Sequence, residues 1–223
     1  MPSPLYSATK LFSRFVRRQC LREFILHGER IHRPGGYLLA PTHVSHIEPM
    51  LISSIFERPI QWMARKEFYQ VPVLATALRH LDAFCVNRQG VPVSAIRTAI
   101  RLAREERVVG IFPEGGCRKG RHLVFRGGRI KQGICLIATR AQVPIVPAIV
   151  LGTHALNEID PWLPGLTGQV WLAFGNAIHP PPIPAMRDRK RSREQLTLKV
   201  EAEYVRLYQE LLTVAGLRDA MTP

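Results

Sequence analysis

Short apolar runs alternate with amphipathic stretches along most of the chain. Runs that are apolar, β-branched or aromatic and bounded by turn residues predict strands at 36–41, 60–68, 81–88, 108–116, 143–152 and 169–178. Apolar residues that recur at helical spacing between these runs predict helices over 48–57, 93–107 and 127–142. This alternation predicts an α/β fold, in which a mixed sheet is flanked by helices and functional groups gather at strand ends.

The first residues of the chain have a basic amphipathic pattern. Apolar and basic side chains fall on different arcs over residues 4–25, which predicts an N-terminal helix at ~100° per residue. The apolar arc includes Leu11, Phe12 and Phe15. Such a helix is typical of an anionic membrane surface, so we expect these three residues to contact the membrane. Alternatively the apolar stripe packs on the domain, and both interpretations can hold in part.

The elements divide the chain into three regions. Residues 1–33 carry the membrane-association helix, and residues 34–180 form the α/β core. Residues 181–223 begin as a Pro-rich, basic linker, and a C-terminal helix over 193–215 then packs on the core.

The charge balance narrows the choice of partners. The 223 residues include 31 Lys and Arg against 17 Asp and Glu, a net charge of +14, with 46% hydrophobic residues as in globular proteins. Such a surface favours nucleic acid, anionic lipid, phosphorylated substrates or an acidic carrier protein. We expect no nucleic acid partner, because recognition-helix, RNP and zinc-finger signatures are missing from the sequence.

Cysteine spacing and hydropathy indicate the compartment. The four cysteines are far apart and lack C-x-x-C spacing, which argues against a zinc cluster and fits a reducing cytoplasm. No apolar run reaches the ~20 residues that span a bilayer. The N-terminus also lacks a signal-peptide pattern. We therefore expect a cytoplasmic protein that associates peripherally with the inner face of the membrane.

The stretch APTHVSHIEP, residues 40–49, holds the candidate chemistry. His43 and Glu48 are five residues apart, and on a helix that offset is ~140°, so the chain must turn for them to meet. A carboxylate that orients the imidazole would leave its other nitrogen to remove a proton from an alcohol. Two alternatives stay open, a metal site formed by His43, His46 and Glu48 and a purely structural turn, although we expect no metal.

Further motifs follow this stretch in a fixed order. A strand ends at Arg88, Phe-Pro-Glu-Gly ends another at Glu114 and Gly115, and an apolar strand contains Val-Pro. With the His-x4-Glu motif, the series resembles the 1-acylglycerol-3-phosphate acyltransferase family. The resemblance implies an α/β fold and direct acyl transfer from acyl-coenzyme A or acyl carrier protein to a lysophospholipid, without a bound cofactor.

The resemblance also implies roles for single residues. His43 is the general base, and Glu48 replaces the family's aspartate. The acceptor phosphate is bound by Arg65, Arg88, Glu114, Gly115 and Arg118. Apart from the resemblance, the basic run after Glu114 contains no acidic residue, and its charge density favours binding of the donor or another anion through Lys119, Arg121, Arg126 and Lys131. The alternative, a solvated basic face, stays open.

This chain departs from the family pattern at Gly116 and Cys117. The family has Glu-Gly-Thr-Arg where this chain has Glu-Gly-Gly-Cys, so Arg118 is displaced by one position. The departure leaves the acceptor open between lysophosphatidic acid and another hydroxylated lipid. Cys117 has no matched histidine in the sequence, and we interpret it as incidental.

Overall fold

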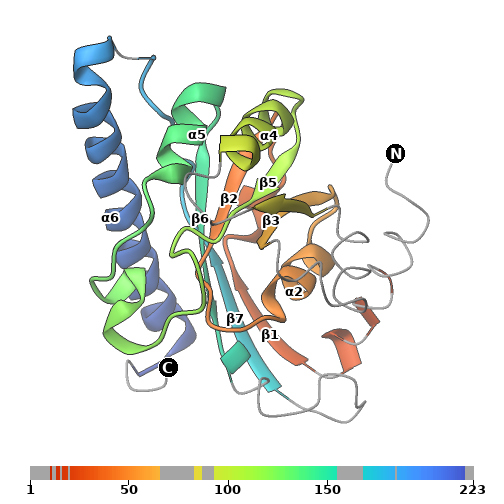
Figure 1. The fold of residues 1–223 in the computed structure, drawn as a ribbon. Coiled ribbons are helices and arrows are strands. Elements are labelled where there is room, and N and C mark those ends of the chain that lie inside the picture. Colours follow the sequence, from red (N-terminus) through yellow and green to blue (C-terminus); the bar gives the residue numbers. More distant parts are fainter. Residues whose placement is uncertain are drawn as a thin grey trace.

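The computed structural model describes residues 11, 14–15, 17–19, 21–65, 83–86, 93–154, 168–183 and 185–218. Within them seven strands form one sheet in the order β1-β7-β6-β2-β5-β3-β4 (Figure 1). The strands are β1 (Leu21–Leu26), β2 (Tyr37–Pro41), β3 (Ile60–Arg65), β4 (Phe84–Val86), β5 (Val108–Gly110), β6 (Ile145–Leu151) and β7 (Gly168–Phe174). The helices are α2 (Glu48–Ile55), α4 (Val93–Arg104), α5 (Gly133–Ala141) and α6 (Arg189–Ala215).

The sheet is mixed, as predicted. Strands β6, β2, β5, β3 and β4 run parallel to one another, whereas β7 is antiparallel to β6 and parallel to β1. The parallel strands therefore all end at one edge, which we call the carboxyl edge. Ligands of open α/β sheets bind outside this edge.

Helices cover both faces of the sheet. Helices α4, α5 and α6 lie on one side and α2 on the other (Figure 1). Alternate residues of β2 point to opposite faces, so Leu38 packs with α4, α5 and α6 while Leu39 packs with α2. Every residue of β2 is buried, which explains its continuous apolar sequence. Strand β2 is thus held rigidly from both sides where it delivers the chain to the carboxyl edge.

The N-terminal helix predicted over 4–25 is too long, because residues 21–26 form β1. Phe24 packs against one core cluster of the sheet and Ile25 against the other, which requires the two-residue repeat of a strand. The described residues before β1, Leu11 among them, are helical. The sheet thus includes part of the region 1–33 that we had assigned to the membrane element.

Several further boundaries differ from the prediction, among them the start of α5 at Gly133 instead of residue 127. Strand β5 ends at Gly110, and the chain turns after it, where the backbone N–H of Gly115 donates to the oxygen of Phe112 at 3.1 Å. Helix α6 begins at Arg189, inside the region predicted as a linker. Side chains of α6, including Leu207 and Leu211, are buried against the core. The added residues Arg189, Lys190 and Arg191 are exposed, and their earlier helical start agrees with the favourable helix propensity of Arg and Lys.

Candidate active site

His43 and Glu48 meet across a turn at the carboxyl edge. Strand β2 ends at Pro41 and α2 begins at Glu48, with Pro49 in its first turn, where a proline fits. His43 Nδ1 lies 2.8 Å from Glu48 Oε2. Because the carboxylate accepts, Nδ1 carries a hydrogen, and in the neutral ring Nε2 is the acceptor nitrogen.

Glu48 is held in place by several donors. Its Oε1 accepts the backbone N–H groups of Val44 and Ser45, each at 3.0 Å, and the hydroxyl of Thr153 at 2.8 Å. The residue is fully buried. These bonds compensate the desolvation of the carboxylate and set its orientation, so the ring of His43 meets a rigid partner.

Aromatic stacking orients the other side of the His43 ring. The ring lies on Phe112 with centroids 4.0 Å apart, and Phe112 lies on Trp62 at 5.1 Å. The indole N–H of Trp62 donates to the hydroxyl of Ser53 in α2 at 2.9 Å. The sequence pattern does not predict these contacts, because they join the turns after β2 and β5 with strand β3.

The Phe-Pro-Glu-Gly turn holds the backbone of His43 at both ends. The N–H of His43 donates to Glu114 Oε2 at 3.0 Å, and the N–H of Arg118 donates to the carbonyl of His43 at 2.8 Å. Glu114 Oε1 accepts the N–H of Val124 at 2.9 Å. Gly115 closes the turn with φ of +79°, a conformation that favours glycine. Buried Glu114 therefore positions His43.

The surroundings of His43 raise its pKa. Burial of the ring lowers the pKa, but hydrogen bonds with Cys117 and Glu48, together with the charges of both groups, outweigh burial and raise it to about 9. The neutral, proton-accepting ring therefore predominates only above a higher pH than it does in an exposed histidine.

Cys117 is not isolated, contrary to the interpretation from sequence. Its side chain is exposed and hydrogen-bonds the ring of His43. His46 is also exposed, and its ring meets that of His43 edge-on at 5.9 Å. One potential ligand atom from each of the three residues lies within 4.8 Å of the other two. The fold thus brings together groups from two turns that are far apart in sequence.

A hollow of about 530 Å³ lies beside the Glu114 turn and is lined by basic residues. We call it the basic hollow, and its cationic side chains come from Arg118, Arg121, Arg129 and Lys131. Arg129 also pairs with Glu201 at 2.8 Å. Of the predicted anion-binding residues, Lys119 and Arg126 do not line the hollow. The concentration of positive charge suits a phosphate or another anion.

The remaining predicted residues lie in several places. Arg65 is the last residue of β3, at the carboxyl edge. Arg88 and Phe12 lie outside the described residues. Leu11 and Phe15 are 70% and 62% exposed. Among the described residues, we find no helix with the length and apolar content that crossing a membrane requires.

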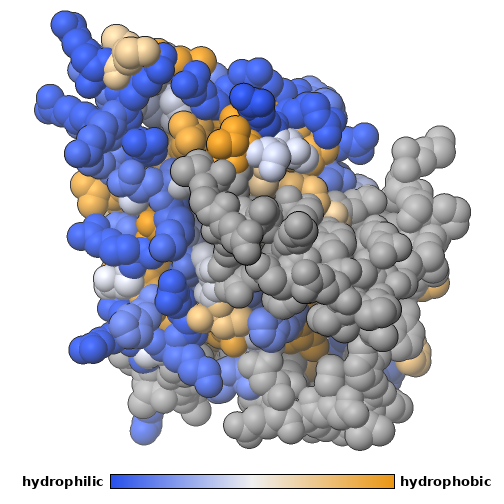
Figure 2. Space-filling view, viewed as in Figure 1, coloured by the Kyte–Doolittle hydropathy of each residue, from blue (hydrophilic) through white to orange (hydrophobic). Residues whose placement is uncertain are grey.

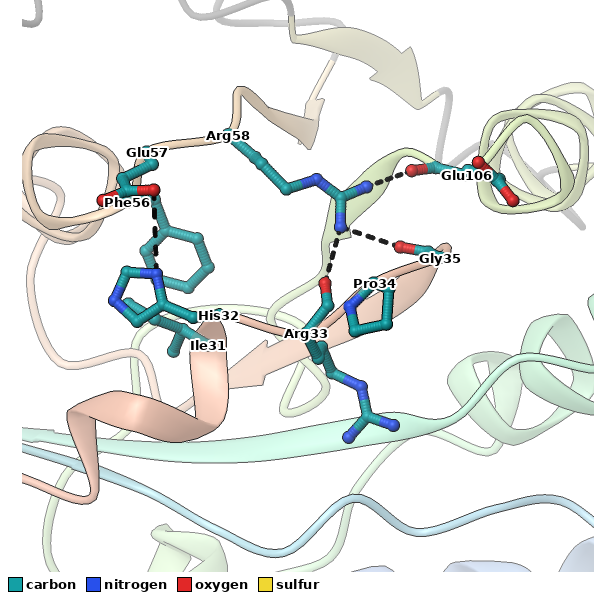
Figure 3. Close-up of a pocket in the computed structure, with 9 residues that line it drawn as sticks. All are labelled: Ile31, His32, Arg33, Pro34, Gly35, Phe56, Glu57, Arg58 and Glu106. Carbon is teal, nitrogen blue, oxygen red and sulfur yellow. Dashed lines mark hydrogen bonds and ion pairs between the residues drawn. The ribbon is translucent and has the colours of Figure 1, made fainter.

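A second hollow, of about 580 Å³, opens at the opposite edge of the sheet (Figure 3). Its residues precede β2, β3 and β5 in the chain. The guanidinium of Arg58 donates there to the backbone oxygens of Arg33, Gly35 and Glu106. Those hydrogen bonds join loops. His32 and Glu57 also line this hollow (Figure 3), but their atoms are 3.9 Å apart and both side chains are at least half exposed, whereas His43 and Glu48 are 2.8 Å apart and Glu48 is fully buried. The chemistry therefore belongs to the carboxyl edge.

Comparison with known proteins agrees with this location. The chain is 28% identical over 156 residues to the 1-acyl-sn-glycerol-3-phosphate acyltransferase of Bacillus subtilis, covering 70% of this chain and 73% of that protein. It is 26% identical over 159 residues to the Helicobacter pylori protein of the same name, covering 67% of this chain and 65% of that protein.

The fold also matches a solved structure. The 1-acyl-sn-glycerophosphate (LPA) acyltransferase PlsC from Thermotoga maritima superposes with a TM-score of 0.60 at 21% identity, covering 88% of this chain and 79% of that chain. The predicted α/β fold and the resemblance drawn from the motifs are thereby confirmed. The model of the family described as Acyltransferase matches residues 23–151, more than half of the sequence, and the chain therefore belongs to this acyltransferase family.

Proposed function

We propose that this acyltransferase moves a fatty acyl group from a thioester to the free hydroxyl of 1-acylglycerol-3-phosphate in phospholipid synthesis. The hydrogen bond of 2.8 Å between His43 Nδ1 and Glu48 Oε2 carries the proposal. It holds the imidazole in the tautomer whose Nε2 accepts a proton, which is what an alcohol nucleophile requires. The names of the two relatives support the choice of acceptor.

The reaction is one direct transfer. His43 Nε2 takes the proton of the acceptor hydroxyl while the oxygen attacks the thioester carbonyl. The tetrahedral intermediate then collapses, the C–S bond breaks, and the thiolate of coenzyme A or acyl carrier protein leaves with the proton from His43. Glu48 stabilises the imidazolium that forms in between, and Glu114 keeps the backbone of His43 in register.

The basic hollow supports anionic substrates on both sides of the reaction. The acceptor carries a phosphate monoester, and the donor carries either the phosphates of coenzyme A or an acidic carrier protein. We assign Arg65, Arg88 and Arg118 to the acceptor phosphate. For the donor we propose Lys119, Arg121, Arg126 and Lys131. Direct contact of Glu114 with the acceptor stays a prediction, since both its carboxylate oxygens already accept backbone hydrogen bonds.

We further propose that the protein works on the inner face of the membrane, in the cytoplasm. Leu11 and Phe15 extend from the N-terminal helix with most of their surface exposed. Arg14 of the same segment donates to the backbone oxygen of Ser54 in α2 at 2.9 Å. The segment can thus dock on the domain through its polar side and offer apolar side chains to the lipid.

Helix α6 differs from this segment. On the described part of the visible face, hydrophilic side chains predominate along α6 (Figure 2).

A panel of acceptors and donors tests the function. The purified chain is incubated with 1-acylglycerol-3-phosphate, lysophosphatidylcholine or monoacylglycerol, each with acyl-coenzyme A or acyl carrier protein loaded with the same acyl chain, and the lipid product is measured by mass spectrometry. We expect the phosphate monoester to be acylated fastest. Faster acylation of lysophosphatidylcholine or of monoacylglycerol would show that the preferred acceptor is another lipid. The displaced Arg118 leaves this alternative open.

A further inference from the structure

His46 and Cys117 lie next to the general base, and neither takes part in the bonds that form or break during the transfer. Each can offer one ligand atom, and these atoms and one ring nitrogen of His43 all lie within 4.8 Å of one another. In a tetrahedral zinc site with bonds of about 2.0–2.3 Å, ligand atoms are roughly 3.3–3.8 Å apart. Because the side chains of His46 and Cys117 are exposed, small rotations of these two can supply the difference.

The chemical nature of the three groups matches one class of ion. Thiolate and imidazole together favour Zn²⁺ over the hard cations Mg²⁺ and Ca²⁺, which prefer oxygen. Three protein ligands leave a fourth position for water. The metal site considered from sequence alone consisted of His43, His46 and Glu48. In the structure the carboxylate of Glu48 is turned toward His43 and the backbone, and Cys117 is the third potential ligand instead.

The surroundings of His43 resemble the outer shell of a zinc site. Histidines that bind metal commonly donate their other ring N–H to a carboxylate, which orients the ring. Glu48 does so at 2.8 Å. The Glu48 carboxylate and a Cys117 thiolate together balance the charge of a divalent ion. Neighbouring Arg118 opposes a cation, but its guanidinium donates to the backbone oxygen of Glu114 at 3.2 Å and is thus turned toward that turn.

We propose that His43, His46 and Cys117 bind one Zn²⁺ and that the bound ion inhibits acyl transfer. The ion takes the lone pair of His43 Nε2, the same lone pair that accepts the hydroxyl proton. Binding and proton abstraction therefore exclude each other. The inhibition rests on the proposed function, whereas the binding does not.

Cobalt absorption tests the binding without any catalysis. The full chain is stripped of metal with a chelator and titrated with Co²⁺, and Zn²⁺ is then added in competition. We expect one Co²⁺ per chain, a sulfur-to-cobalt charge-transfer band and displacement by Zn²⁺. Cys117→Ser should lose the band, and His46→Ala should bind at least about tenfold more weakly, because loss of even an indirect partner costs about 10- to 100-fold. An unchanged titration in both variants would overturn the site.

Inhibition is tested by measuring the product lipid at increasing Zn²⁺. Wild-type transfer should fall with Zn²⁺ and return with EDTA, and His46→Ala should need at least about tenfold more Zn²⁺ for half-inhibition. His179→Ala is the control, since His179 is exposed and follows Ile178, which pairs with the first residue of β6 at the opposite edge of the sheet. Equal Zn²⁺ sensitivity of His46→Ala and His179→Ala would contradict the proposal. Normal cobalt binding by a chain that transfers no acyl group would instead reject the proposed function alone.

Discussion

The carboxylate of Glu114 accepts the backbone N–H of His43 at 3.0 Å, so two turns that are 71 residues apart form one unit. The Phe-Pro-Glu-Gly turn is thus a scaffold for the base. The exposed surface of Glu114 is only 1%, and its other oxygen binds the N–H of Val124. A substitution at Glu114 should therefore act through the position of His43.

Glu114→Gln should lower kcat by about 10- to 100-fold with little change in either KM, because a small displacement of a catalytic group costs up to about 10²-fold. The amide places a donor against a backbone N–H and leaves one buried donor unsatisfied. Steady-state kinetics against both substrates gives the result. Glu57→Gln, at an exposed glutamate that precedes β3, is the matched control. A selective rise in the acceptor KM would instead support direct contact of Glu114 with the acceptor.

His43→Ala should lower acyl transfer by about 10²- to 10⁴-fold, the usual contribution of a general base. The fold should persist, since the substitution removes a ring from a turn and leaves the hydrophobic core unchanged. Circular dichroism and thermal unfolding verify the fold, and metal-free His46→Ala should retain most activity. Transfer by a folded His43→Ala variant at near wild-type rate would remove His43 from the mechanism.

The pH profile of kcat/KM should rise toward alkaline pH. Transfer requires neutral His43, and a pKa of about 9 means that the protonated ring predominates at neutral pH. Below that pKa the rate should increase about tenfold per pH unit and then level off. Cys117→Ala removes a hydrogen-bond partner that raises the pKa of His43, so its profile should rise at a lower pH. Identical profiles of wild type and Cys117→Ala would show that Cys117 does not influence the base.

The His43–Glu48 pair could be predicted because both residues lie on one short turn between β2 and α2. The strands at 36–41 and 143–152 were also recognisable, since buried parallel strands are continuously apolar. Contacts between distant segments were not accessible in the same way. Cys117 approaches His43 only because β2 and β5 are neighbours in the sheet.

Strand β1 could not be predicted from local sequence periodicity. Residues 21–26 continue the helical pattern of the preceding segment, so local periodicity favoured one long helix. Their pairing with β7, where Leu21 lies opposite Gly168, decides otherwise. Tertiary contacts outweigh local preference here. Deletion of the membrane element must therefore stop before β1.

Membrane binding should depend on Leu11 and Phe15. Burial of such a side chain contributes about 1.5–3 kcal/mol, so Leu11→Glu with Phe15→Glu should strongly reduce co-sedimentation with anionic vesicles. Leu198→Glu on α6 is the matched control, since Leu198 is 56% exposed on another element. If the double variant sediments like the control, the N-terminal helix docks on the domain without entering the lipid.

Substitution of Arg118 should distinguish the acceptor site from the donor site. Arg118 lines the basic hollow, and its backbone N–H binds the carbonyl of His43, so its side chain starts beside the proposed base. Arg118→Ala should raise the acceptor KM more than the donor KM. Loss of a charge-assisted contact costs about 1.5–3 kcal/mol, which corresponds to roughly 10- to 150-fold. Arg88→Ala should behave in the same way, and Arg88→Lys should restore only part of the loss, because a point charge replaces a planar fork.

Arg121→Ala is the counterpart on the donor side. Arg121 lines the same hollow but lies three residues further along the chain from the Phe-Pro-Glu-Gly turn than Arg118 does. Its loss should therefore raise the KM for the thioester. Both kinetic constants are measured for each variant with each substrate varied in turn. A higher thioester KM for Arg118→Ala, with the acceptor KM unchanged, would place Arg118 in the donor site. The acceptor would then need no phosphate near Arg118. The displacement of this arginine by one position would have moved it from the acceptor to the donor.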